Sequence, residues 1–457
     1  MADIAGLLSE VVGHAHVLVG DAIAADYTHD EALTAAPVVP ACVVRPSSTA
    51  EVSEILRIAR DQRVPVVARG SGTGLSGAAV PRADSLLVSF ERMAQVLEID
   101  TDNHVAVVQP GVTLQQLDEA TAAAGLVYPV FPGESSASLG GNVATNAGGM
   151  RAVKYGVTRH QVLGVEAVLA GGEVIRTGGK FVKSSTGYDL TQLIVGSEGT
   201  LALVTEATLK LYPRPAHAAT VLAPFDALDG VAGAVAPVVG SGIGPRILEY
   251  VDSLTMAAIT GNVGLDLAVP AEVAARASAY LVVVLESDHD DRLEEDVARL
   301  GELLSALGAI DVYVLPPTAG TQLISAREKA FFVAKAAGAD DIVDVVVPRA
   351  EIPRYLDRVG SLAQEHAALV TGCGHVGDGN VHLSVFQPDP ERRHALLGAL
   401  FEAGVDLGGA ITGEHGVGTE KKQYFMALTD PATVDLLRRI KAAFDPDGIL
   451  NPGKIFD

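Results

Sequence analysis

The sequence predicts an α+β protein with two or three domains. From Pro37 onward, short runs of β-branched and other apolar residues alternate with amphipathic segments, the pattern of a sheet with helices packed on it. In the second half, helical segments alternate with runs expected to form antiparallel strands. The chain has 457 residues, of which 48% are hydrophobic, so it can bury the core of more than one domain.

Composition narrows the function classes. Asp and Glu outnumber Lys and Arg by 56 to 33, a net charge of −23, which disfavours nucleic acids and anionic membranes as partners. No apolar run approaches the ~18 residues of a membrane span and residues 1–13 carry no basic signal segment, so a cytoplasmic protein is expected. The two cysteines, Cys42 and Cys373, are too few for a disulfide framework or an iron–sulfur cluster, and Cys373 is expected to be a small buried residue. Redox chemistry would therefore need another cofactor.

Periodicity and capping predict the elements of the first half. Residues 1–36 are expected to be helical, because apolar residues from Ile4 to Val12 share one helical face. A helix over residues 49–62 can be capped by Ser48 or Thr49. Strands are expected at residues 42–45, 65–68, 85–89, 165–169 and 205–211.

A second domain is expected after a proline-stiffened linker at residues 212–216. Its predicted strands lie at residues 219–223 and 279–285, and its predicted helices at residues 291–307 and 352–365. An amphipathic helix at residues 433–444 belongs to the last part of the chain.

Three glycine-rich loops predict one elongated polar ligand. The first, Arg69–Gly77, contains G-x-G-x-x-G, but a Rossmann domain needs a helix that opens at the third glycine, and here Pro81 and a strand follow. Its backbone N–H groups could still cradle a pyrophosphate, although a flexible turn would have the same composition. Residues 132–149 and 187–201 repeat the small polar character, which suits backbone lying against a flat ligand.

A predicted β-hairpin at residues 368–386 carries two histidines. If residues 377–380 form its turn, His375 faces His382 across the strands, with Cβ atoms about 5 Å apart. Glu414 and His415, in the sequence Gly-Glu-His-Gly, offer a third metal ligand and a spare base. The alternative is a pair of histidines satisfied in a core or exposed at a turn; the second cluster favours a functional site.

The order of these motifs resembles one flavoprotein superfamily. Residues 37–214 resemble the PCMH-type FAD-binding domain of the vanillyl-alcohol-oxidase superfamily. The whole chain resembles the branch of D-lactate dehydrogenases, glycolate oxidase catalytic subunits and D-2-hydroxyglutarate dehydrogenases. The resemblance implies an N-terminal helical segment (1–36), a PCMH-type FAD domain (37–214), an α+β cap domain with the hairpin (215–412) and a segment that returns near the flavin (413–457). The motifs that carry it are Arg69–Gly77, Gly140–Gly149, Gly196–Gly199, the hairpin, Gly413–Gly416 and Asn451–Phe456.

The resemblance implies FAD as the cofactor, with its pyrophosphate on the first loop and its isoalloxazine against the later loops. Some relatives link the flavin through a histidine in or beside the first loop; none lies there, so non-covalent FAD is expected. The FAD-binding residues implied are Arg69, Gly70, Ser71, Gly72, Thr73, Gly74, Leu75, Ser76, Gly77, Pro132, Gly133, Ser138, Gly141, Asn142, Thr145, Asn146, Gly148, Gly149, Glu198, Gly199, Val204 and Asn451.

The implied reaction is oxidation of a 2-hydroxy acid, in which flavin accepts hydride from C2 while a base removes the hydroxyl proton. A Zn or Mn ion on His375, His382 and Glu414 would acidify that hydroxyl, and His415 would take the proton. The resemblance assigns the same roles and adds Arg327 as the group that binds the substrate carboxylate, for which a guanidinium is suited. The alternative for Arg327 is a solvated charge on a helix.

Two departures from the hydroxyglutarate branch narrow the substrate. That branch holds the distal carboxylate with a lysine and has an asparagine after the second hairpin histidine, whereas Ile342 and Ser384 stand at these places here. D-lactate or glycolate is therefore favoured, with D-2-hydroxyglutarate as the alternative. An alkyl-glycerone-phosphate synthase-like transferase and a flavin-carrying accessory subunit are rival functions, both disfavoured by the intact histidine set. The electron acceptor is expected to be a separate electron-transfer protein or a quinone, through which the protein could sit at a membrane, and a homodimer is compatible with the sequence.

Overall fold

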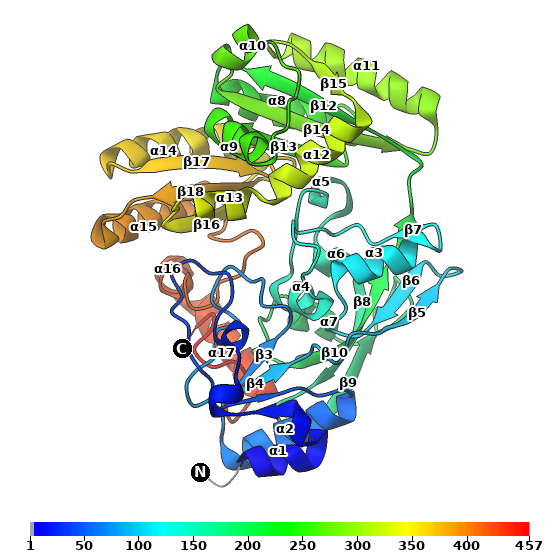
Figure 1. Cartoon of the computed structure of the whole chain (residues 1–457), viewed down its shortest axis with the longest axis vertical. Coiled ribbons are helices and arrows are strands. Elements are labelled where there is room, and N and C mark those ends of the chain that lie inside the picture. The colour runs from blue at the N-terminus through cyan, green and yellow to red at the C-terminus, as the bar shows by residue number, and fades with distance from the viewer. Residues whose placement is uncertain (1–3, 457) are drawn as a thin grey trace.

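The computed structural model describes residues 4–456, which form two lobes, one above the other in Figure 1. We call residues 4–213 with residues 422–456 the lower lobe, and residues 217–411 the upper lobe. Helices and strands are mixed in both, which confirms the α+β prediction. Across residues 4–456, no helix has both the length and the apolar character needed to cross a bilayer.

The first sheet of the lower lobe is largely parallel. Helices α1 (Ile4–Val12) and α2 (Thr49–Gln62) pack on it through apolar side chains such as Leu8 and Ile55. The Ser48 hydroxyl accepts from the Glu51 N–H at 3.2 Å, so Ser48 is the N-cap of the two candidates that the sequence offers. The strands, in spatial order, are β1 (Val17–Leu18), β2 (Cys42–Val44), β4 (Leu86–Ser89) and β3 (Val66–Arg69).

The second sheet of the lower lobe is antiparallel and packs against short helices. The helices α3 (Leu114–Ala122), α4 (Leu139–Thr145) and α7 (Leu190–Ile194) contribute to its core, and α5 (Ala152–Tyr155) and α6 (Thr158–Gln161) follow α4. Two further strands, β7 (Leu126–Val127) and β11 (Tyr212–Pro213), form a separate antiparallel pair. This pair holds the start of the predicted linker against the lower lobe. The strands of the sheet, in order, are β5 (Val96–Asp100), β6 (Val105–Val108), β10 (Leu203–Lys210), β8 (Val162–Val168) and β9 (Val174–Gly178).

The upper lobe is built on a seven-stranded antiparallel sheet. One face packs on α8 (Leu228–Gly240), α11 (Asp290–Ala306), α14 (Ile352–Glu365) and α15 (Pro390–Asp406). The other face packs on α9 (Ser253–Val263), α12 (Pro317–Glu328) and α13 (Ala330–Ala336), and α10 (Ala271–Arg276) precedes β14. The strands, in order, are β15 (Tyr313–Leu315), β12 (His217–Phe225), β14 (Ala279–Ser287), β13 (Ile247–Asp252), β17 (Leu369–Gly374), β18 (Asn380–Phe386) and β16 (Asp341–Val346).

The alternation of side chains along these strands places polar residues on one face. In β16, Val343 and Val345 enter the core shared with α14 and α15, so Ile342 and Asp344 point to the opposite face. In β18, Leu383 enters the same core, and its neighbour His382 points away from it. The sheet therefore presents a row of polar side chains on the face opposite α14 and α15.

The C-terminal residues return to the lower lobe, where α16 (Lys422–Leu428) and α17 (Pro431–Phe444) lie beside the first sheet (Figure 1). Leu450 bridges to Val66 of β3. The Lys454 ammonium donates to the carbonyls of Gly77 at 2.6 Å and Val80 at 3.0 Å. The end of the chain thus buttresses the first glycine-rich loop.

Most predicted elements are confirmed with small shifts at their ends, but the helical prediction for residues 1–36 is wrong beyond Val12. Residues 1–3 lie outside the described residues. Gly13 has φ of +85°, a left-handed conformation that ends α1, and the chain continues through short 3-10 turns and β1. No helix opens at Gly77 either, where the chain turns and then enters β4, so the expectation against a Rossmann domain is confirmed.

Candidate functional site

The two hairpin histidines and Glu414 form one cluster. His375 follows β17, His382 lies within β18, and Glu414 lies in the loop before α16. The Glu414 Oε1 atom lies 3.1 Å from His375 Nε2 and 3.2 Å from His382 Nε2, and potential ligand atoms of the three residues lie within 4.8 Å of one another. Ligand atoms around one tetrahedral cation are separated by about 3–3.5 Å, so this set fits a divalent metal.

The predicted register of the hairpin is wrong by two residues. His382 pairs with Cys373 rather than with His375, and the Asn380 N–H donates to the His375 carbonyl at 3.2 Å. The turn therefore lies between His375 and Asn380 and includes the fully buried Val376. A shift of two residues returns every side chain to the same face, so the histidines still meet, with ring centroids 4.8 Å apart at 81°.

A buried carboxylate joins His375 to Arg327. Glu249, in β13, lies with Oε1 at 2.6 Å from His375 Nδ1 and with Oε2 at 2.7 Å from Arg327 Nη2. Burial acts to raise the pKa of Glu249, but the charges of His375 and Arg327 outweigh burial and lower it. The carboxylate is therefore ionised and orients both side chains, while the buried Nε of Arg327 has no hydrogen-bond acceptor among residues 4–456.

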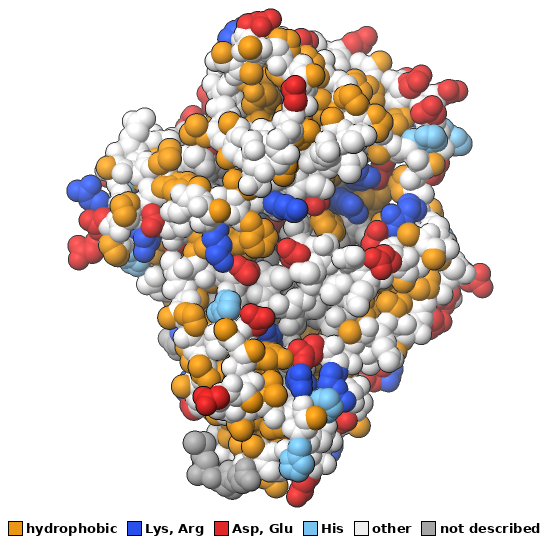
Figure 2. Space-filling model, in the orientation of Figure 1, with side chains coloured by type: hydrophobic (Ala, Val, Ile, Leu, Met, Phe, Trp, Pro, Cys, Tyr) orange, Lys and Arg blue, Asp and Glu red, His pale blue; other side chains and the backbone are white. Residues whose placement is uncertain are grey.

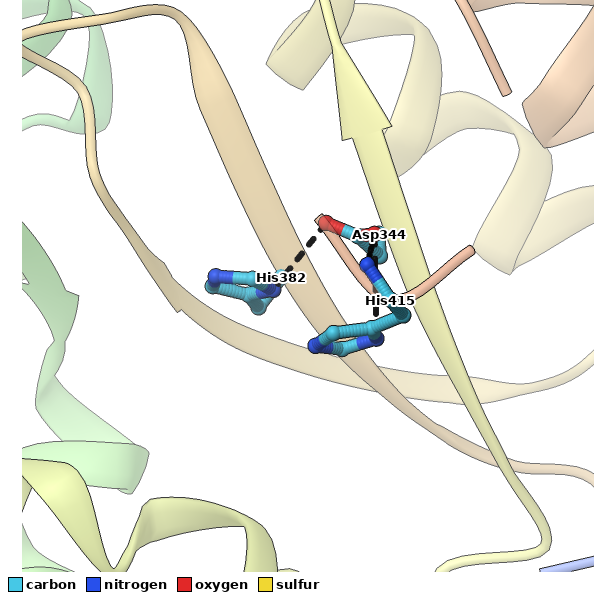
Figure 3. A group of neighbouring side chains, drawn as sticks. All are labelled: Asp344, His382 and His415. Atoms are coloured by element: carbon cyan, nitrogen blue, oxygen red, sulfur yellow. Dashed lines mark hydrogen bonds and ion pairs between the residues drawn. The ribbon is translucent and has the colours of Figure 1, made fainter. Parts of the chain in front are cut away.

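Asp344, in β16, accepts the hydrogen bonds of the loop that carries Glu414 and His415, and Figure 3 shows its contacts with His382 and His415. Its Oδ2 atom accepts from the Thr412 hydroxyl at 2.7 Å and from the His415 N–H at 2.8 Å. The N–H groups of Gly413 and Glu414 donate to the same oxygen, each at 3.1 Å. Its Oδ1 atom accepts from the Asn380 amide at 2.7 Å. A single fully buried carboxylate thus fixes the loop against the hairpin.

His415 is stacked on His382, with ring centroids 5.1 Å apart and planes at 18° (Figure 3). Burial lowers the pKa of His415 to about 4; Asp344 opposes this effect, and Lys421 reinforces it. Its imidazole is therefore neutral at neutral pH, and its buried Nδ1 has no hydrogen-bond partner within the described chain. A neutral imidazole beside a metal-ligand cluster can accept a proton.

A cleft in the lower lobe is lined by residues from all three glycine-rich loops. Three buried polar atoms along it, Ser76 Oγ, Asn142 Nδ2 and Asn451 Oδ1, have no partner among the described residues, as expected where a polar ligand supplies one. A Cβ at Gly70 would collide with Ser138, so glycine is needed for the first two loops to approach. Predicted FAD-binding residues that line the cleft are Gly70, Ser71, Gly72, Thr73, Gly74, Leu75, Ser76, Pro132, Ser138, Gly141, Asn142, Thr145, Glu198, Gly199 and Asn451.

Two non-glycine residues of this cleft hold a left-handed backbone, Glu198 at φ 51° and Asn451 at φ 42°. The Asn451 amide donates to the Glu198 carbonyl at 2.7 Å, and the Glu198 carboxylate accepts from the N–H groups of Val417 and Gly418, each at 2.8 Å. These contacts stabilise a conformation that would cost about 1–3 kcal/mol alone. They also connect the cleft to the loop that carries Glu414 and His415.

The remaining predicted FAD-binding residues support the cleft from behind or lie beside it. The Arg69 guanidinium donates to the His29 carbonyl at 2.6 Å. Asn146 accepts from the Arg159 N–H at 2.9 Å, and a Cβ at Gly148 would lie 2.6 Å from Glu414 Oε2. Gly133 lines the neighbouring cavity instead. Gly77, Gly149 and Val204 also lie outside the lining of the cleft.

The cleft meets a second cavity of about 290 Å³ between the lobes. Leu75, Pro132, Glu414 and His415 line both, and Arg327, His375 and His382 line the second. A ligand in the cleft and a small molecule in the cavity would therefore meet beside His415. On the face shown in Figure 2, lysine and arginine side chains lie along the junction of the lobes, with aspartate and glutamate side chains among them.

Sequence patterns did not identify Glu249 or Asp344. Each is fully buried and is flanked by apolar residues within its strand, in Ile-Leu-Glu-Tyr-Val and Ile-Val-Asp-Val-Val. A charged residue in a strand buried on both faces needs a partner, and this signal could have marked both as site residues.

Comparison with known proteins agrees with this architecture. Residues 40–178 match the FAD binding domain model, and residues 214–455 match the model of the C-terminal domain of FAD linked oxidases. An uncharacterized FAD-linked oxidoreductase of Mycobacterium tuberculosis is 56% identical over 100% of this chain and 99% of its own length. The glycolate oxidase subunit GlcD of Bacillus subtilis is 39% identical over 91% of this chain and 89% of its own. D-lactate dehydrogenase of Archaeoglobus fulgidus is 39% identical over 90% of each chain.

The fold recurs in a solved structure of p-cresol methylhydroxylase, with a TM-score of 0.80 at 18% identity over 99% of this chain and 96% of that one. At this identity the likeness concerns the fold alone. Together, the two matched domain models, the relative that spans the whole chain and the cleft lined by glycine-rich loops support FAD as the cofactor and show the class. The chain belongs to the FAD-linked oxidases, in the branch that includes the glycolate oxidase subunit GlcD and D-lactate dehydrogenase.

Proposed function

We propose that this protein oxidises a D-2-hydroxy acid with one carboxylate to the 2-keto acid. The observation that carries the proposal is the meeting of the FAD cleft and the Arg327 cavity at Glu414 and His415. Bound FAD, held without a covalent bond, would supply the hydride acceptor. The relatives named for glycolate and D-lactate support the substrate class.

Different side chains of the cavity are proposed to bind the substrate and to remove its proton. Arg327, oriented by Glu249, binds the carboxylate of the acid through donors that include its unpartnered Nε. His415, neutral because it is buried, removes the hydroxyl proton. A Zn or Mn ion on His375, His382 and Glu414 would lower the pKa of that hydroxyl. Glu249 orients His375 through its other ring nitrogen, as carboxylates behind metal ligands commonly do.

Two residues of the cavity wall favour a substrate with one carboxylate over a substrate with two. Ile342 and Ser384 line it at the places where the hydroxyglutarate branch is expected to have a lysine and an asparagine. Neither side chain can form an ion pair with a second carboxylate. D-lactate and glycolate are therefore preferred over D-2-hydroxyglutarate.

Electrons are proposed to leave the flavin for a separate electron-transfer protein or a quinone, in the cytoplasm. The two cysteines, Cys42 and Cys373, are both buried, and the chain has too few cysteines to hold an iron–sulfur relay of its own. The acidic surface and the absence of a bilayer-crossing helix among the described residues support this location.

The test is the visible spectrum of the purified FAD-loaded protein, followed without oxygen as 2-hydroxy acids are added. D-2-hydroxy acids should bleach the flavin band and their L-enantiomers should not. His415→Asn should keep the flavin band but lose this bleaching, because the proton acceptor is gone. A flavin band that no 2-hydroxy acid bleaches would reject the proposal and favour the transferase or accessory-subunit function.

A further inference from the structure

The cavity beside the metal-ligand cluster is mostly apolar. It is lined by side chains of α9, α13 and the outer strands of the upper sheet, among them Ile259, Phe331, Val333, Ala334, Ile342 and Phe386. D-lactate has a single methyl group beyond its reacting carbon, and glycolate has none. A volume of about 290 Å³ therefore exceeds what either acid can fill.

The polar groups of the cavity form one connected set. Arg327 pairs with Glu249, Glu249 contacts His375, and His375 contacts Glu414. The groups that bind the carboxylate and the hydroxyl therefore lie together, and they fix the position of C1 and C2 of the acid. The side chain on C2 has the apolar part of the cavity to enter.

The charges in the cavity do not suit a second anionic group. Among the described residues that line it, Arg327 is the one lysine or arginine, and the carboxylate on C1 occupies it. Glu328 also lines the wall. A charged tail would lose its hydration without gaining an ion-pair partner.

We propose that the preferred substrates are D-2-hydroxy acids with a bulky aliphatic side chain, of the kind derived from branched-chain amino acids. This inference rests on the proposed function and specifies its substrate. Each methylene buried in the cavity should raise kcat/KM about fourfold, the equivalent of its transfer from water. The gain ends when the cavity is filled, because a tightly packed wall then resists further atoms.

The experiment measures flavin reduction in the FAD-loaded protein with D-lactate, D-2-hydroxybutyrate, D-2-hydroxyvalerate and D-2-hydroxyisocaproate. The expected result is a rise in kcat/KM of roughly 10- to 100-fold from the first acid to the last. D-2-hydroxyvalerate and D-2-hydroxyglutarate form a matched pair of equal chain length, and the uncharged tail should react faster. A flat or falling series, or a faster reaction of the dicarboxylate, would overturn the inference.

Two variants of α13 locate the effect. Ala334 lines the cavity, whereas Ala336 on the same helix is exposed and outside its wall. Ala334→Phe should lower the ratio of kcat/KM for D-2-hydroxyisocaproate to that for D-lactate by about tenfold or more, because the ring fills the space for the longer side chain. Ala336→Phe should keep the ratio of the parent. An unchanged ratio in Ala334→Phe would place the longer side chain elsewhere.

The outcomes separate this inference from the proposed function. If D-lactate and glycolate reduce the flavin and longer acids react no faster, the oxidation is retained and the apolar specificity is rejected. If no 2-hydroxy acid of any length reduces the flavin, the proposed function fails and the inference fails with it.

Discussion

At the scale of single residues, Asp344 shows how a side chain that touches no substrate can set the geometry of a site. Its Oδ2 atom accepts hydrogen bonds from Thr412 and from three consecutive N–H groups, Gly413 to His415, and its Oδ1 accepts from Asn380. Charge-assisted hydrogen bonds of this kind are about twice as strong as neutral ones. The positions of Glu414 and His415 therefore depend on a carboxylate in the neighbouring strand.

Asp344→Asn should lower kcat/KM for flavin reduction by roughly 10- to 100-fold, the equivalent of one or two charge-assisted hydrogen bonds. The amide replaces one acceptor by a donor, which would face either Asn380 or the loop N–H groups. FAD content should stay at the level of the parent, because Asp344 does not line the cleft. The exposed Asp357→Asn is the matched control, and parent-like turnover in Asp344→Asn would remove this residue from the mechanism.

At the scale of elements, the C-terminal segment and the first glycine-rich loop form one unit. Lys454 is buried and donates to two carbonyls at the end of that loop, Gly77 and Val80. Burial lowers the pKa of Lys454 to about 8, and Asp30 and Glu198 oppose this effect. The loop that faces the FAD cleft is therefore held from behind by residues far away in sequence.

Lys454→Met keeps much of the length of the side chain but removes both hydrogen bonds. The loop carbonyls would lose a charged donor, so the dissociation constant of FAD should rise about tenfold or more. Titration of the apoprotein with FAD, read by flavin fluorescence, measures this change. Lys183→Met, in an exposed segment, serves as the control; equal FAD affinity in both variants would contradict a supporting role for Lys454.

The sequence was sufficient for the types of most elements but not for the register of the hairpin. The glycines at 377 and 379 marked the turn, yet the loop is set by a contact that the sequence does not reveal, the bond from the Gly377 N–H to Leu248 in β13 at 3.1 Å. The prediction that the two histidines meet was still correct, because a register shift of two residues keeps each side chain on the same face of the sheet. The helical prediction for the N-terminal segment was wrong for a similar reason. The apolar periodicity ends at Val12, and the turns that follow are stabilised by distant contacts such as the hydrogen bond from Arg69 to His29.

The same limit explains which site residues could be predicted. His375, His382, Glu414 and the glycine-rich loops stand in recognisable local patterns. Glu249 and Asp344 act through partners that lie 126 and 71 positions away in sequence, His375 and His415. Such pairings follow from the order of strands in the upper sheet, which a single sequence does not specify.

At the scale of the whole molecule, the site is assembled from segments that lie far apart in the sequence. The upper sheet supplies Glu249, His375 and His382, and the loop before α16 supplies Glu414 and His415. That loop is then bonded to the lower lobe, where Glu198 accepts from Val417 and Gly418 at 2.8 Å each. A cation on the histidines and Glu414 would therefore join the upper sheet to the segment that closes the FAD cleft.

Removal of metal should for this reason affect activity and the stability of the whole protein, but not the cofactor. Dialysis against a chelator should abolish flavin reduction by the acid and lower the unfolding temperature, since a ligand bound to the native state alone stabilises it by mass action. The flavin spectrum should persist, because none of the residues that line the FAD cleft other than Glu414 belongs to the ligand set. Addition of Zn or Mn should restore both properties.

The matched control is His382→Ala, which removes one ligand from the set and should make the unfolding temperature insensitive to the chelator. A fall in the parent that this variant does not show assigns the effect to a site that includes His382, which belongs both to the group with His375 and Glu414 and to a group with Asp344 and His415. Equal sensitivity of the two proteins would locate the stabilising metal at another site. Full turnover of the chelated parent would show that neutral His415 and Arg327 suffice for the oxidation without a cation.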